Sequence, residues 1–78
     1  MDDWHDLKVG IMRTLLKEKF KQERFRNLLL STGDVHIQEG NTWGDIFWGV
    51  DLRSNIGENN LGKLLMEIRK DLRKVELP

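Results

Sequence analysis

The chain is 78 residues long; 38% of its residues are hydrophobic and 33% are charged, with 13 basic and 13 acidic side chains. This length allows one small domain over residues 1–78, and the hydrophobic share is too high for a disordered protein. The sequence contains no cysteine, which excludes disulfides, thiolate metal sites and a thiol nucleophile. No apolar run approaches the ~20 residues that a bilayer requires, and the acidic start is untypical of a signal peptide. We therefore expect a cytoplasmic protein that does not associate with a membrane.

The charges are distributed unevenly along the chain. Residues 8–26 and 63–74 are mainly basic, whereas residues 34–58 carry five acidic side chains and one arginine. The two basic segments could attract a nucleic acid through its phosphates. Solvated helix faces commonly have the same composition, so both interpretations stay open.

Apolar residues recur at helical spacing in the N-terminal part of the chain. Asp2 or Asp3 can cap a first helix, and Gly10 weakens it by about 1 kcal/mol relative to alanine without ending it. A second helical stretch covers about residues 22–31, and Gly33 is placed to close it. No glycine or proline separates the two stretches, so they form either two helices or one bent helix. The apolar positions of the first stretch are Trp4, Leu7, Ile11, Met12, Leu15 and Leu16.

Two short strands are predicted in the middle of the chain. Val35 and Ile37 alternate with polar neighbours, and residues 47–50 form a short apolar run. The turn-rich residues 40–45 lie between them. This order favours a short β-hairpin with a tryptophan-rich loop.

A C-terminal amphipathic helix is the clearest element of the sequence. Asn59 or Asn60 can act as its N-cap, and its apolar residues form one stripe. With the two N-terminal helices or one bent helix and the short hairpin, it predicts a mainly α (α+β) fold. The residues of the stripe are Leu61, Leu64, Leu65, Ile68, Leu72 and Val75.

The segment from residue 39 to residue 50 contains the residues best suited to chemistry. Trp43 and Trp48 can stack on a flat ligand, and the three glycines of the segment let the backbone approach it. Glu39 and Asp45 supply carboxylates that can act as an acid or stabilise a developing cation, which cleavage of an N-glycosidic bond requires. In a purely structural alternative, the two tryptophans and Phe47 form a core plug and Asp45 is a turn or capping residue.

Other kinds of site find little support. His5 and His36 are too isolated to form a metal site, and neither has an evident partner for nucleophilic catalysis. The sequence also has no phosphate loop of the glycine–lysine–serine type. We therefore expect neither a metal nor a cofactor.

Three blocks of the sequence are similar to a known family. The first block lies within residues 3–34, the second is the segment 39–50, in which an acidic residue is followed closely by Trp-Gly, and the third is the segment 57–69. In order and spacing, the blocks resemble the second half of NADAR (NAD- and ADP-ribose-related) domains over nearly the whole chain. The first block consists of Asp3, Trp4, Lys8, Met12, Leu16, Lys19, Phe20, Gln22, Leu28, Leu29 and residues 31–34.

The resemblance implies a mostly helical N-glycosidase or ADP-ribose-handling fold. Members of the family act on a ribosylamino-pyrimidine intermediate of riboflavin synthesis or remove ADP-ribose from guanine in nucleic acid. By position, Asp45 and Trp48 would be the catalytic residues on the ribose side of the pocket. The start of the last helix, residues 59–61, could offer backbone N–H groups to a phosphate. The ligand-binding residues would be Glu39, Trp43, Gly49, Asn60 and Gly62.

The chain also departs from the family, because it has no counterpart of the first half of a NADAR domain. We expect a naturally short version, one product of a split gene or a trimmed chain, with an ADP-ribose-like or ribosyl-phosphate ligand. The alternative is a non-catalytic interaction protein, such as a regulator or a phage-type inhibitor, that keeps the fold without the chemistry. A homo-oligomer, most simply a two-fold dimer through Trp4, Ile11 and Leu15, or another protein would cover the missing half.

Overall fold

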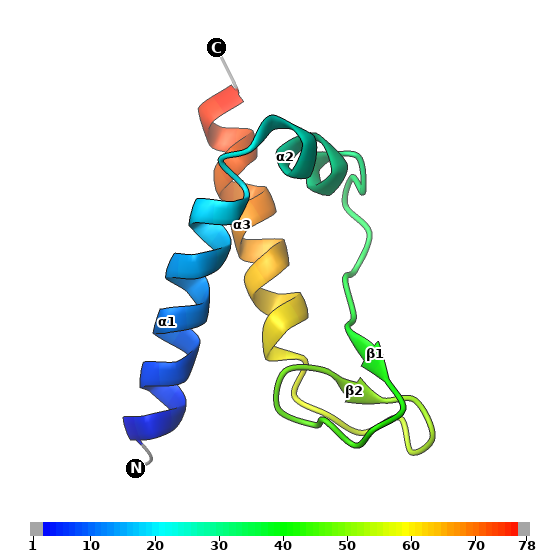
Figure 1. The fold of residues 1–78 in the computed structure, drawn as a ribbon. Helices are drawn as coiled ribbons and strands as arrows, with labels where there is room; N and C mark the ends of the chain where they lie inside the picture. Colours follow the sequence, from blue (N-terminus) through cyan, green and yellow to red (C-terminus); the bar gives the residue numbers. More distant parts are fainter. Residues whose placement is uncertain (1–2, 77–78) are drawn as a thin grey trace. The chain divides into compact units, whose positions relative to one another are not determined.

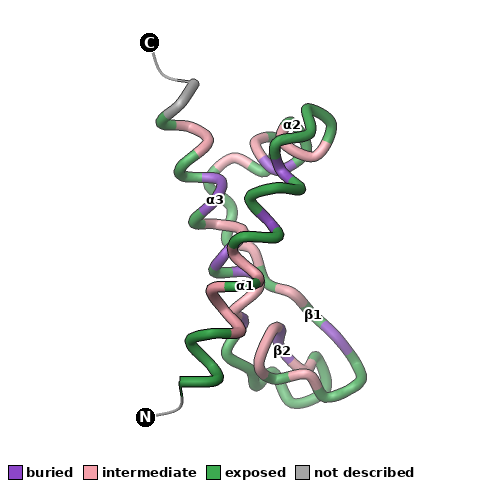
Figure 2. Tube along the Cα trace, turned by 60° about the vertical axis from the view of Figure 1, so that its left-hand side comes forward, coloured by how far each residue is buried: buried purple, intermediate pink, exposed green. Residues whose placement is uncertain are grey.

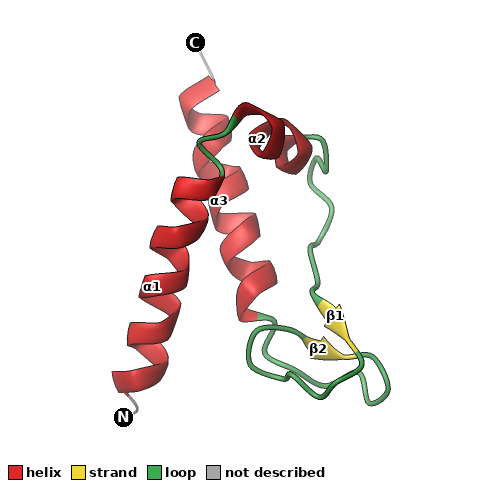
Figure 3. Ribbon diagram, viewed as in Figure 1, coloured by secondary structure: helices red, strands yellow, loops and turns green. Residues whose placement is uncertain are grey.

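The computed structural model describes the backbone of residues 3–76 and the side chains of residues 3–74, so the expectation for the Val75 side chain lies outside it. The elements along the chain are α1 (Asp3–Lys19), α2 (Glu23–Leu30), β1 (Gly40–Asn41), β2 (Val50–Asp51) and α3 (Asn60–Glu76) (Figures 1 and 3). This confirms the predicted mainly α, α+β fold class. The chain divides into two compact units, unit 1 (Met1–Gly33) and unit 2 (Asp34–Pro78).

Unit 1 contains two separate helices rather than one bent helix. The last α-type hydrogen bond of α1 joins Phe20 N–H to Leu16 O at 2.9 Å, and the next two N–H groups bond three residues back. Gln22 is then extended (φ −73°, ψ 128°), so α2 starts afresh at Glu23. The break therefore occurs without glycine or proline because the last turn of α1 tightens.

The core of unit 1 lies near this break. Leu16, Phe20 and Leu29 are buried, and the rings of Phe20 and Phe25 meet edge to face with centroids 6.4 Å apart. α2 ends at Leu30 with Ser31 as its C-cap, and Gly33 follows with the left-handed backbone expected of a closing glycine: it has φ 63°, and its N–H donates to Leu30 O at 3.1 Å.

Unit 2 is organised around α3. Leu64 and Ile68 of the predicted stripe are each 3% exposed, and Figure 2 shows buried positions along this helix. Arg69 is also buried, at 6% exposure, and its Nη1 donates to Val35 O at 2.8 Å. This bond gives the buried guanidinium a partner and ties α3 to the segment that precedes β1.

The segment at residues 35–37 is not a strand, which corrects the prediction. The N–H of Ile37 donates to Met66 Sδ at 3.4 Å, and Ile37 O accepts a bond from Asn59 Nδ2 at 2.9 Å. Side chains at and before α3 therefore take the place of a neighbouring strand. Asp34 lies at the start of this segment, where a hydrogen bond from Arg73 (2.5 Å) and then its charge hold the pKa of the Asp34 carboxyl below its ordinary value.

The two strands pair in parallel, with Gly40 opposite Val50 and Asn41 opposite Asp51, and so do not form the predicted hairpin. Val50 N–H donates to Glu39 O at 2.8 Å. Parallel pairing requires the intervening residues 42–49 to make a complete loop instead of a simple reversal. Within residues 3–76, no helix is long and apolar enough to cross a membrane.

Candidate functional site

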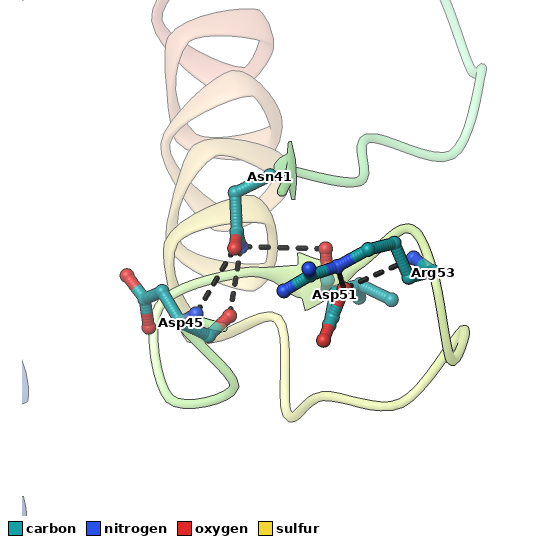
Figure 4. A network of polar contacts seen from close by, with 5 residues as sticks. Asn41, Asp45, Asp51 and Arg53 are labelled. Carbon is teal, nitrogen blue, oxygen red and sulfur yellow. Dashed lines mark hydrogen bonds and ion pairs between the residues drawn. The ribbon is translucent and has the colours of Figure 1, made fainter. Parts of the chain in front are cut away.

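The loop between β1 and β2 is closed by one buried asparagine. Asn41 is 5% exposed; its Oδ1 accepts Asp45 N–H at 2.9 Å, and its Nδ2 donates to Asp45 O at 2.8 Å and to Val50 O at 3.3 Å (Figure 4). The amide thus imitates a strand partner for the backbone of Asp45. Trp43 lies within the closed turn and is 77% exposed. A rigid turn therefore carries an open aromatic side chain.

Asp45 orients the next two residues. Its Oδ1 accepts the N–H groups of both Phe47 and Trp48, each at 3.0 Å. The rings of these two residues meet edge to face, with centroids 4.7 Å apart, and both residues are half-buried. One oxygen of Asp45 therefore has the turn role that the purely structural alternative gives to this residue. In the described part of the chain, Oδ2 makes no hydrogen bond or ion pair, and Figure 4 shows the carboxylate directed away from Asn41.

The loop is joined to the start of α3 by four backbone hydrogen bonds. The N–H groups of residues 58–61 donate to the carbonyl groups of residues 46–49, at 2.8 to 3.3 Å. Asn60 adds a side-chain bond from Nδ2 to Phe47 O at 2.9 Å. The N–H groups of residues 59–61 are therefore already engaged, which corrects the expectation that they could receive a phosphate.

Two of the predicted ligand-binding glycines lie where backbone segments meet. A Cβ on Gly49 would overlap Glu39 O, and a Cβ on Gly62 would overlap Ile37 O and the Asn59 amide. Both glycines are buried. They allow the loop, β1 and α3 to approach one another, and any contact with a ligand would be additional to this role.

Glu39 completes the set of predicted residues. It is half-buried, its N–H donates to Asn59 Oδ1 at 2.9 Å, and its carbonyl accepts Val50 N–H. Its backbone is thus held at two points directly before β1. All seven predicted site residues belong to unit 2, and they come from two places in the sequence: the segment 39–49, and Asn60 and Gly62 at the start of α3.

The family model of the NADAR domain matches residues 1–73, which includes this loop and the start of α3. This chain belongs to the NADAR family. The NADAR match also includes α1 and α2, so it extends over both compact units. The predicted resemblance is confirmed.

Named relatives of this NADAR chain include N-glycosidases. N-glycosidase YbiA of Escherichia coli is 41% identical over 71 residues, which are 90% of this chain and 43% of that protein. An N-glycosidase of Nostoc punctiforme is 39% identical over 74 residues, 94% of this chain and 46% of that protein. A riboflavin biosynthesis protein of Vibrio vulnificus is 40% identical over 73 residues, 92% of this chain and 19% of that protein.

The chain therefore spans less than half the length of each of these NADAR relatives. No solved structure matches it. Among residues 3–76, no group of three histidine or acidic side chains is arranged to hold a metal ion.

Two asparagines that hold the candidate site together were not predicted from the sequence. Asn41 received no role, although it stands four residues before Asp45 with a glycine between them, a spacing typical of a closed turn. Asn59 was considered only as a helix cap. Its backbone is left-handed (φ 56°), and its amide lies beside Gly62 of α3, where it bonds Ile37 O and Glu39 N–H.

Proposed function

We propose that this chain forms part of an N-glycosidase that acts on a phosphorylated ribosyl or ADP-ribosyl ligand. Three facts support the proposal: the chain belongs to the NADAR family, two of its relatives are named N-glycosidases, and a carboxylate and tryptophans share one rigid loop. Asp45 is the observation that carries it. Oδ1 of this residue is fixed by two N–H groups, while Oδ2 has no partner in the described structure.

The chemistry follows from this arrangement. When the N-glycosidic bond breaks, its electron pair leaves with the nitrogen of the base and positive charge develops on the ribose. The Asp45 carboxylate stabilises that charge and accepts a proton from the water that attacks the ribose carbon. The nitrogen of the base takes up a proton, so that free base and a ribosyl product result. Trp48 forms the wall beside this carbon.

The other predicted residues have supporting roles in the proposal. Trp43, which is 77% exposed, stacks on the flat base. Glu39, whose backbone is held directly before β1, orients a ribose hydroxyl. Gly49, Asn60 and Gly62 shape the floor of the site, since all three make or permit close contacts between backbone segments.

The experiment uses Asp45→Asn. Asparagine keeps an oxygen that can accept the two N–H groups but removes the charge and the base. The matched control is Asp51→Asn, because Asp51 Oδ1 also accepts a backbone N–H, that of Arg53, at 3.0 Å. Release of free base from a ribosylamino-pyrimidine phosphate and from ADP-ribosylated guanosine is followed by chromatography. We expect Asp45→Asn to abolish release and Asp51→Asn to retain it; retained release in both would refute the role of Asp45.

Binding is measured separately by titrating ADP-ribose calorimetrically into the chain and into Trp48→Ala. Because the chain spans 43% and 46% of the two N-glycosidases, the part of a NADAR domain outside these residues is proposed to complete the site. Binding without release, also after a second polypeptide is added, would favour the alternative of a non-catalytic interaction protein. A cytoplasmic location stays a prediction.

A further inference from the structure

One face of α1 is apolar and exposed along most of the helix. Residues at positions i, i+3, i+7 and i+11 of an α-helix lie on the same face. Figure 2 shows the first turn of α1 as exposed. The four large side chains at these positions, with their exposed fractions, are Trp4 (58%), Leu7 (55%), Ile11 (50%) and Leu15 (60%).

The rest of α1 does not account for this face. Leu16 is the buried residue of the helix, and it projects about 100° away from Leu15. Four large apolar side chains in one line expose about 400 Å² if each contributes about 100 Å². The largest apolar patch on a typical monomer is of this size and is often functional.

The comparisons indicate what covers this face. Residues 4–15 lie inside the family match, so the face belongs to the NADAR domain itself. The matched region is 43% of the E. coli N-glycosidase and 46% of the Nostoc N-glycosidase, so more than half of each relative lies outside it. That remainder is large enough to cover a helix of 17 residues, about 25 Å long.

A second copy of the chain is the competing occupant. Pairing two such faces across a two-fold axis would bury about 800 Å² in total, twice the area of one face. Stable interfaces bury about 1,200–2,000 Å². Self-association through this face alone therefore falls short, whereas the remainder of a domain can bury the face and add contacts of its own.

We propose that the apolar face of α1 is the docking surface for the part of a NADAR domain that these 78 residues do not span. The inference rests on family membership and on the exposed face, and it holds whether or not the chain cleaves an N-glycosidic bond. In chemical terms, the partner offers an apolar groove of helix width, with room for a tryptophan at the end that receives Trp4.

The test is co-purification. The tagged chain is co-expressed with the part of the E. coli N-glycosidase outside the matched region, and the affinity of the complex is then measured. The test variant is Leu7→Gln/Leu15→Gln, because glutamine favours the helix and removes apolar area. The control is Leu28→Gln in α2, since Leu28 is 66% exposed but lies outside the face. Circular dichroism verifies that all three chains are equally folded.

We expect a one-to-one complex that the double variant weakens about 100-fold and the control leaves unchanged. A failure to co-purify, or equal binding by the double variant and the original chain, would overturn the inference. Concentration-dependent dimerisation that the double variant abolishes would overturn it in favour of a second copy. Since the readout is binding, a complex without base release would count against the proposed function alone.

Discussion

Replacing Asn59 with alanine tests how unit 2 is held together. Asn59 is 6% exposed, has φ 56°, and makes two side-chain hydrogen bonds of 2.9 Å, to Ile37 O and from Glu39 N–H. Losing two such bonds costs about 2 kcal/mol at about 1 kcal/mol each. A left-handed backbone costs alanine about 1 kcal/mol more. We therefore expect Asn59→Ala to lower the free energy of unfolding by about 3 kcal/mol.

Asn55 provides a matched control. It has nearly the same backbone, with φ 59°, but it is exposed, and its side chain makes no hydrogen bond in the described structure. Asn55→Ala should therefore cost only the backbone contribution, about 1 kcal/mol. Glycine removes that contribution, so Asn59→Gly should cost about 2 kcal/mol and Asn55→Gly almost nothing.

Urea unfolding, followed by far-ultraviolet circular dichroism and tryptophan fluorescence, measures these differences. With a slope near 1 kcal/mol per molar urea, the midpoint should fall by about 3 M for Asn59→Ala and about 1 M for Asn55→Ala. Equal losses at the two positions would show that the Asn59 amide contributes nothing and would refute its role in joining β1 to α3.

The remaining predictions concern other parts of the chain. Gly62→Ala should destabilise unit 2 by about 3 kcal/mol in the same urea assay, because the new Cβ would overlap Ile37 O and the backbone of α3 would have to shift. Gly10→Ala should raise the free energy of unfolding, measured by thermal unfolding, by about 1 kcal/mol, because Gly10 lies inside a helix and a Cβ there meets nothing within 4 Å. A loss of stability would contradict this. The lowered pKa of Asp34 stabilises the fold above the ordinary carboxyl pKa, about 3.9, and this contribution disappears as the pH falls through the lowered value. Asp34→Asn should therefore remove a small acid-dependent part of the stability, and identical acid titrations of both chains would contradict the role of Arg73.

The helices could be predicted from the sequence because their signals are local. Capping residues, apolar spacing and Gly33 all act within a few residues of the element that they define. The segment at residues 35–37 could not be predicted in this way, since Arg69, which bonds Val35 O, is 34 residues away. Its alternating pattern indicated a strand, and only the folded chain shows that side chains at and before α3 take the place of a neighbouring strand.

In the candidate site, the sequence identified the segment that forms the loop but not how its residues are arranged. Trp43 and Trp48 share one loop, as expected, yet one is open and the other is half-buried against Phe47. The parallel pairing of β1 and β2 depends on Asn41 and on the bonds between residues 46–49 and 58–61. Each of these bonds except the two between Asn41 and Asp45 closes over nine or more residues, beyond the reach of a local pattern.

Asp45 has a structural and a proposed chemical role, and two substitutions separate them. Asp45→Ala removes the acceptor for Phe47 and Trp48 N–H, so it should lower stability by about 2 kcal/mol as well as abolish base release. Asp45→Asn keeps that acceptor, so it should cost less than about 1 kcal/mol. If both variants lose base release while the free energy of unfolding falls mainly in Asp45→Ala, the carboxylate acts in the chemistry and not only in the turn. If release instead follows stability, so that Asp45→Asn retains it, Asp45 is a turn residue, and the base must be sought at Glu39 or in the part of the NADAR domain that docks on α1.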